Sequence, residues 1–183
     1  MTTTVAITAE DFERIAPVLG PCELVQGEIV RMSPGGFEHS RITVRVVFLL
    51  ESHSRRDKLG RVLTNEAGMV VRRGPDTVRG ADALFISFRR LPRSENWKGF
   101  LQQVPELVVE VLSEDDSWKK MEEKIADYHT FGVDMVWVID PRTLAVRLYP
   151  RGAEPFVLHS TDEIDGGELL PGFRCRVAEF FGD

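Results

Sequence analysis

The segment that most constrains the fold is the near-continuous apolar run Pro105–Leu112, with the sequence PELVVEVL. A run of this kind is typical of a strand buried on both faces of a sheet. The next segment, Ser117–Phe131, has apolar residues at helical spacing and ends at Gly132, and Asp134–Asp140 is a second apolar strand. Because a strand–helix–strand crossover places its two strands parallel, we predict a sheet with helices packed on it.

Further strands and one long helix are predicted around this unit. Glu23–Met32 favours two short strands about a Gln26-Gly27 turn, and a helix is expected from about Glu38 to Lys58. We therefore expect an α/β (α+β) fold with a central mixed sheet flanked by helices, an added N-terminal hairpin and a β-rich C-terminal segment. The remaining predictions are a short helix after Thr8 and strands at Arg61–Thr64, Gly68–Arg72, Ala83–Ser87, Leu144–Tyr149, Pro155–His159 and Phe173–Val177.

Length and charge limit the class of protein. A chain of 183 residues with 43% hydrophobic residues is expected to form a single domain over residues 1–183. Its net charge of −6 argues against a protein that coats nucleic acid by bulk electrostatics. The two cysteines, Cys22 and Cys175, form no CxxC pattern, which favours a reducing, cytoplasmic setting. No signal peptide or spanning segment is predicted, so we expect no membrane partner.

Two acidic residues interrupt apolar strands, and they are the first candidates for chemistry. Glu110 lies inside the Pro105–Leu112 strand, and Asp82 opens the apolar segment that follows it. A buried carboxylate must be paired, protonated or bound to a metal. Carboxylates on adjacent strands can share a hard cation such as Mg²⁺, which activates water and stabilises charge on a phosphate. The alternatives are that Glu110 pairs with an arginine and that Asp82 caps a turn.

A lysine on the following helix is the third candidate. Along Ser117–Phe131 the residues Met121, Ile125, Tyr128 and Phe131 form an apolar stripe, and Lys124 falls inside it. An inward-facing lysine just after Glu110 is suited to orienting a water or neutralising a scissile phosphate. Alternatively, its stem packs against the core while its ammonium remains in solvent.

Weaker candidates surround these three. Glu28, after the Gln26-Gly27 turn, and His39, at the start of the long helix, are possible ligands or general bases. Arg41 and Arg45 lie one turn apart on that helix, and Arg79 precedes Asp82. Such arginines either follow a phosphate backbone or form a solvated face.

Taken together, these residues resemble the Uma-two family, long filed as a domain of unknown function. That family is placed in the restriction-endonuclease-like PD-(D/E)XK superfamily. The resemblance runs in order over nearly the whole chain. The matching stretches are Glu23–Val30, Met32–Pro34, Glu38-His39, Asp82 with Leu84–Ser87, Pro105–Ser113, Glu123-Lys124 with Tyr128, Gly132-Val133, Trp137–Pro141, Leu170–Phe173 and Phe180.

The resemblance implies a role for each candidate. Asp82 corresponds to the aspartate of the PD element and Glu110 to the acid of the (D/E)XK element, with Glu28 as an additional acid and the backbone carbonyl of Val111 as a further metal ligand. Leu112 stands where the lysine of (D/E)XK is expected. The resemblance implies that Lys124 on the next helix takes the place of that lysine.

Our leading hypothesis is a Mg²⁺- or Mn²⁺-dependent endonuclease that hydrolyses DNA phosphodiester bonds at Asp82 and Glu110, assisted by Lys124. The alternatives are a catalytically silent binding or interaction module with a nuclease fold, and a hydrolase of small phosphoesters. Exposed strand edges also make a homodimer a reasonable hypothesis.

Overall fold

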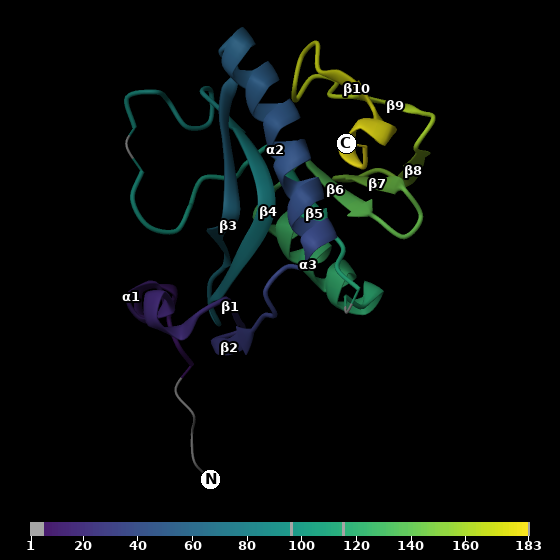
Figure 1. Cartoon of the computed structure of the whole chain (residues 1–183). Helices are drawn as coiled ribbons and strands as arrows, with labels where there is room; N and C mark the ends of the chain where they lie inside the picture. Colours follow the sequence, from purple (N-terminus) through teal and green to yellow (C-terminus); the bar gives the residue numbers. More distant parts are fainter. Residues whose placement is uncertain (1–5, 96, 115, 183) are drawn as a thin grey trace.

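A mixed sheet of eight strands forms the centre of the protein in a computed structural model that describes residues 6–95, 97–114 and 116–182 (Figure 1). The strands follow the order β2-β1-β4-β5-β6-β7-β8, and β3 pairs with the other side of β4. Their bounds are β1 Cys22–Val25, β2 Glu28–Arg31, β3 Gly60–Arg72, β4 Thr77–Ser87, β5 Leu107–Val111, β6 Met135–Asp140, β7 Ala145–Pro150 and β8 Phe156–His159.

The helices and a small C-terminal unit cover this sheet (Figure 1). The helices are α1 Ala9–Leu19, α2 Phe37–Asp57 and α3 Trp118–Phe131, and the C-terminal unit contains β9 Glu163–Asp165, β10 Arg174–Arg176 and the 3-10 turn η1 Val177–Phe180. Strands β5 and β6 are parallel and α3 connects them, which confirms the predicted crossover. None of the described helices is long and apolar enough to cross a membrane.

Local sequence signals explain where the helices begin and end. The Thr8 side chain accepts a hydrogen bond from the Asp11 amide at the start of α1, and Ser117 accepts one from the Lys120 amide at the start of α3. Helix α3 ends at Gly132, whose φ of 109° is a left-handed conformation that favours glycine. The bounds of α3 therefore follow from short-range rules.

Strands β3 and β4 are longer than the sequence patterns predicted. The segments expected at Arg61–Thr64 and Gly68–Arg72 form one strand, whose pairing with β4 shifts register between Thr64 and Ala67 and again between Val70 and Arg72. Strand β4 begins at Thr77 rather than Ala83. Its first half contains Arg79 and Asp82, and these polar side chains hide the apolar pattern of a buried strand.

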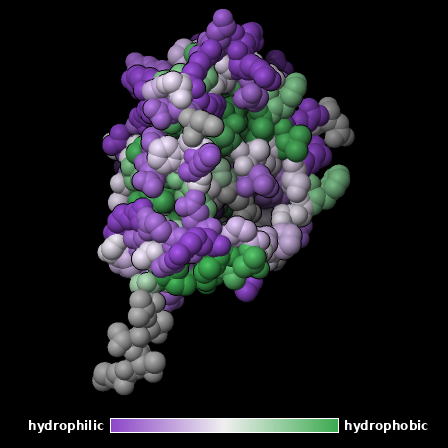
Figure 2. Space-filling model, turned by 90° about the vertical axis from the view of Figure 1, so that its left-hand side faces the viewer, coloured by the Kyte–Doolittle hydropathy of each residue, from purple (hydrophilic) through white to green (hydrophobic). Residues whose placement is uncertain are grey.

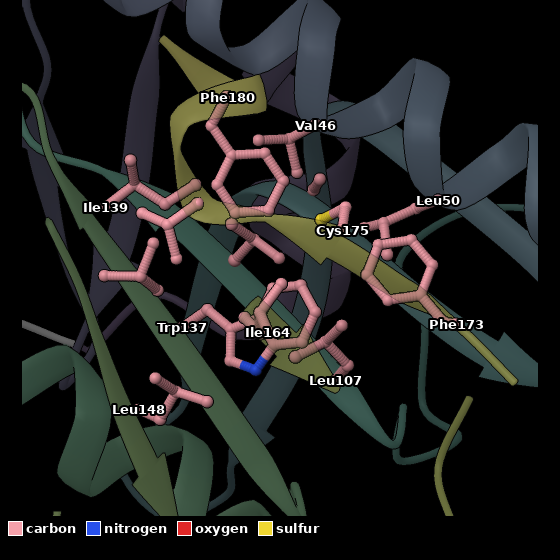
Figure 3. Close-up of a cluster of buried hydrophobic side chains, with 14 of the residues drawn as sticks. Val46, Leu50, Leu107, Trp137, Ile139, Leu148, Ile164, Phe173, Cys175 and Phe180 are labelled. Atoms are coloured by element: carbon pink, nitrogen blue, oxygen red, sulfur yellow. The ribbon is translucent and has the colours of Figure 1, made fainter. Parts of the chain in front are cut away.

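Each face of the sheet carries its own hydrophobic core, because side chains alternate along a strand. On the α2 face, Val109 and Val111 pack with residues of β6 and the C-terminal unit. Trp137, Phe173 and Phe180 lie close together there, with ring centroids 6.1 and 6.4 Å from Trp137 (Figure 3). On the α3 face, the core includes Val108 and Leu112. Glu110 lies on β5 between these two residues, so its side chain enters the α3 face.

Candidate active site

The site lies at a fork where β4 and β5 separate. Their pairing extends from Phe85↔Leu107 to Ala83↔Val109 and goes no further. The next residue of β4 is Asp82, whose Oδ2 accepts a hydrogen bond of 2.7 Å from the Val111 amide of β5. The Asp82 side chain thus accepts a hydrogen bond that a backbone carbonyl of β4 would accept in a continued ladder. The Asp82 carboxylate therefore lies between the two strands.

A histidine from the other layer completes the surroundings of Asp82. His39, in the first turn of α2, places its Nε2 3.1 Å from Oδ1 of Asp82. The hydrogen bond with Asp82 raises the pKa of His39, although burial opposes it. His39 is therefore held in contact with the same carboxylate that occupies the fork.

Glu110 lies on the α3 side of the fork and is almost completely buried. Its carboxylate accepts hydrogen bonds from the Tyr128 hydroxyl at 2.5 Å and from the Lys124 ammonium at 2.9 Å. Burial raises the pKa of Glu110 to about 7, the Lys124 charge opposes that rise, and the neighbouring Asp82 carboxylate adds to it. Two carboxylates therefore share a site with the Lys124 ammonium on one side and the His39 ring on the other.

Lys124 connects three backbone segments. Besides Glu110, its Nζ lies 3.4 Å from Glu23 of β1 and donates a hydrogen bond of 3.2 Å to the Gly80 carbonyl of β4. Burial would lower the pKa of Lys124, but the surrounding carboxylates, Glu110 first, raise it well above its ordinary value. Lys124 is therefore a permanent cation that points inward, as its position in the apolar stripe predicted.

A second set of ion pairs holds Glu23 in place. The buried Arg79 donates hydrogen bonds of 2.8 Å to Glu23 and of 2.7 Å to Asp127 of α3. Asp127 also pairs with Arg72, and the Gly80 amide donates to Glu23. These contacts fix β1, β4 and α3 against one another around Lys124.

The structure brings together Asp82, Glu110, Lys124 and His39, but it does not bring Glu28 to them. Glu28 is exposed at the start of β2, and the hairpin acid that reaches the site is Glu23 of β1. Both acids lie in the same predicted hairpin, and nothing in the local sequence indicated which strand faces α3. Tyr128 was also missed as a polar contact, because the stripe pattern identifies its buried ring and not its hydroxyl.

The three candidate arginines lie in different surroundings. The expectation for Arg79 is wrong, since its side chain is buried and held by two carboxylates. Arg41 donates hydrogen bonds to the Phe181 and Gly182 carbonyls, which attaches α2 to the C-terminal unit. Arg45 is half-buried on α2. A basic hollow of about 510 Å³ lies at the far end of α2 and is lined by Arg55, Lys58, Arg61 and Arg93 among others.

The donors at the fork suit a hard divalent cation. Within residues 6–95, 97–114 and 116–182, no three acidic, histidine or cysteine side chains are grouped closely enough to hold a metal ion on their own. The donor set would therefore be Asp82, Glu110 and a backbone carbonyl. Mg²⁺ is commonly bound by only one or two carboxylates and keeps several waters.

Comparison with known proteins agrees with the fold. The model of the Uma2 family, described as "Putative restriction endonuclease", matches residues 9–178. This chain belongs to that family. It is also similar to the crystal structure of "a putative nuclease belonging to DUF820 from Anabaena variabilis ATCC 29413", with a TM-score of 0.79 and 23% sequence identity over 96% of this chain and 97% of that one. Among curated proteins, no sequence matches this chain. Family membership and the restriction-endonuclease-like fold confirm the predictions from the sequence.

Proposed function

We propose that this Uma2-family chain is a Mg²⁺- or Mn²⁺-dependent endonuclease that hydrolyses DNA phosphodiester bonds at the fork between β4 and β5. One observation carries the proposal. Asp82, Glu110 and Lys124 come from three separate elements and meet where the sheet opens. Two carboxylates are suited to holding a metal that activates water, and an adjacent lysine is suited to stabilising negative charge on a phosphate.

In this proposal the carboxylates of Asp82 and Glu110 hold the metal together with the Val111 carbonyl. The Val111 amide faces Asp82, whereas the Leu112 amide faces β6 by donating to Ile139. Because the amide and carbonyl of one strand residue point to the same side, the Val111 carbonyl is directed toward the fork. When bound, the metal supplies Lewis acidity and lowers the pKa of a water. Glu28 is left out of this set because it is exposed.

The chain's own residues divide the remaining work. Lys124 is charged, so it can orient the attacking water or stabilise negative charge on the phosphate, but it cannot accept the proton of that water. Glu23 and Tyr128 hold Lys124 and Glu110 in their relative positions. His39 favours its protonated form and is suited to donating a proton to a phosphate oxygen or to the leaving sugar oxygen.

The test is cleavage of supercoiled plasmid and of a short duplex by the purified protein in Mg²⁺, Mn²⁺ and EDTA. We expect cutting in either metal and none in EDTA. Asp82→Asn should lower the rate at least 1,000-fold, on the order of losing an essential group in the transition state. Glu28→Gln is the matched control and should keep the wild-type rate. Cutting that persists in Asp82→Asn contradicts the assignment.

A second candidate function is a binding module with a silent nuclease fold. It is favoured by the fact that every carboxylate oxygen of Asp82 and Glu110 already has a protein partner within 3.1 Å. Calorimetric titration with Mg²⁺ and Mn²⁺ separates the two functions. Metal binding without cleavage of DNA favours a silent module, and turnover of a model phosphodiester but not of DNA indicates a hydrolase of small phosphoesters.

A further inference from the structure

The outer face of α2 carries exposed hydrophobic side chains that no described element covers. Phe37, Val44 and Phe48 are 86%, 68% and 67% exposed. Beside them, side chains of α2 and Thr64 of β3 line an apolar hollow of about 290 Å³. Figure 2 shows hydrophobic surface along its right-hand edge, the side on which α2 lies. Exposed apolar patches of this kind on a folded domain mark interaction surfaces.

The residues of this face are arranged symmetrically about Val46. Val44 and Phe48 lie two positions to either side of it, Arg41 and Glu51 lie five positions away, and Phe37 and Arg55 lie nine positions away. At 100° per residue, these six side chains fall within an arc of about 80° on α2. A two-fold axis that crosses this outer face at the level of Val46 would therefore place each residue opposite the other member of its pair.

Each of these pairs is chemically complementary. Val44 would meet the partner's Phe48, and Glu51 would meet the partner's Arg41. Glu51 and Arg55 form no ion pair with any residue in the described part of the chain. Arg41 binds the C-terminal carbonyls and lies 3.9 Å from the Glu38 carboxylate, while 27% of its side chain stays exposed on the same face as Glu51. Arg55 would lie over the partner's Phe37 ring, a favourable cation–π contact.

We propose that α2 packs antiparallel against α2 of a second copy of this chain, with the two-fold axis near Val46. The charges and hydrophobic side chains of the face identify this partner, because the same surface supplies both halves of every pair. Polar residues at the rim and Phe48 at the centre match the usual anatomy of an isologous interface.

The first test is the mass of the full chain in solution by light scattering and sedimentation velocity over a range of concentrations. We expect twice the chain mass of 20.7 kDa. Phe48→Asp should weaken dimerisation at least about thirty-fold, the effect of losing a central interface residue. Val18→Asp, at a hydrophobic residue of α1 that is 85% exposed, is the matched control and should remain dimeric. Circular dichroism of both variants shows whether the fold is kept. A wild-type monomer at all concentrations, or a folded Phe48→Asp dimer, overturns the proposal.

The second test fixes the register of the two helices in a Cys22→Ser background. Val44→Cys and Phe48→Cys proteins, mixed and oxidised, should form a crosslinked heterodimer, whereas each alone should crosslink much less. Efficient crosslinking of either protein with itself, without a crosslinked heterodimer in the mixture, contradicts an axis near Val46. Neither test measures cleavage, so a dimer that does not cut DNA refutes the proposed function and leaves the interface standing.

Discussion

The two faces of the central sheet differ in what they bury. The face under α2 and the C-terminal unit contains an almost purely apolar core around Trp137. The face under α3 adds to its apolar core the polar group Glu23, Arg79, Glu110, Lys124, Asp127 and Tyr128. Both faces use the same strands, and consecutive residues such as Val109 and Glu110 serve opposite sides. Alternation along one strand thus separates the residues that stabilise the sheet from those that build the site.

The two faces also differ in the free energy of burying their side chains. Apolar burial stabilises by roughly 25 cal/mol per Å² and needs no partner, whereas a buried ion must recover a desolvation penalty of several kcal/mol through its contacts. On the α3 face, Arg79 and Lys124 each contact more than one carboxylate, which is how that penalty is offset. A single substitution should therefore have different consequences on the two faces.

The largest effect is expected at neighbouring residues of β5. Glu110→Gln should lower metal-dependent cleavage at least 1,000-fold, because it removes a proposed ligand, while the neutral amide keeps the shape of the site. Val109→Ala should keep the wild-type rate at 25 °C and lose about 2 kcal/mol of unfolding free energy. Plasmid cleavage and urea unfolding measure the two effects. Equal losses of activity in both variants would show that the two faces are not separable.

The next effect is expected when the ion pairs around Arg79 are broken. Arg79→Met should lose about 3–5 kcal/mol of unfolding free energy, since it leaves Glu23 and Asp127 buried without their shared cation. Adding Glu23→Gln and Asp127→Asn should recover part of that loss, because the two buried carboxylates that Arg79 balanced are then neutral. Urea denaturation of the three proteins checks this. A single variant as stable as the wild type would show that Arg79 is not needed to balance these charges.

A smaller effect is expected from pH. Burial and Asp82 raise the pKa of Glu110 to about 7, so at lower pH a metal must displace a proton from this carboxyl group. Metal affinity should therefore fall by about tenfold per pH unit below about 7 and be nearly constant above it. Calorimetric titration of Mn²⁺ from pH 5.5 to 8.5 measures the change. A profile that is flat across this range argues against Glu110 as a ligand.

The smallest effect is expected from Cys175, a titratable group in the apolar core under α2. Burial raises the pKa of the Cys175 thiol to about 12. The stability that comes from burying the neutral thiol is fully present below about pH 9, the ordinary value, and is lost as the pH rises toward 12. Cys175→Ala should cost about 1 kcal/mol and leave the dependence of unfolding free energy on pH unchanged between 6 and 8.5. A thiol that reacts with iodoacetamide in the folded protein at pH 8 would contradict this burial.

The sequence patterns predicted the parts of the molecule where one physical signal dominates. The apolar β5, α3 and β6 were predicted as a crossover, and the place of Lys124 in the helical stripe predicted its inward direction. The first half of β4 was missed because Arg79 and Asp82 are buried through partners from β1 and α3, which no local window contains. The choice of Glu23 over Glu28 likewise depends on which strand of the hairpin pairs with β4.

The position of Lys124 on α3 has a consequence for the order in which the site assembles during folding. Asp82 and Glu110 lie on two strands that pair directly, whereas the ammonium arrives only when α3 has packed against the sheet. A nascent chain that has formed β4 and β5 but not α3 holds both carboxylates without their cation. In the proposed nuclease, hydrolytic capacity would then appear only after the last crossover has closed, so incomplete translation products and partly unfolded chains would be harmless to the cell's DNA.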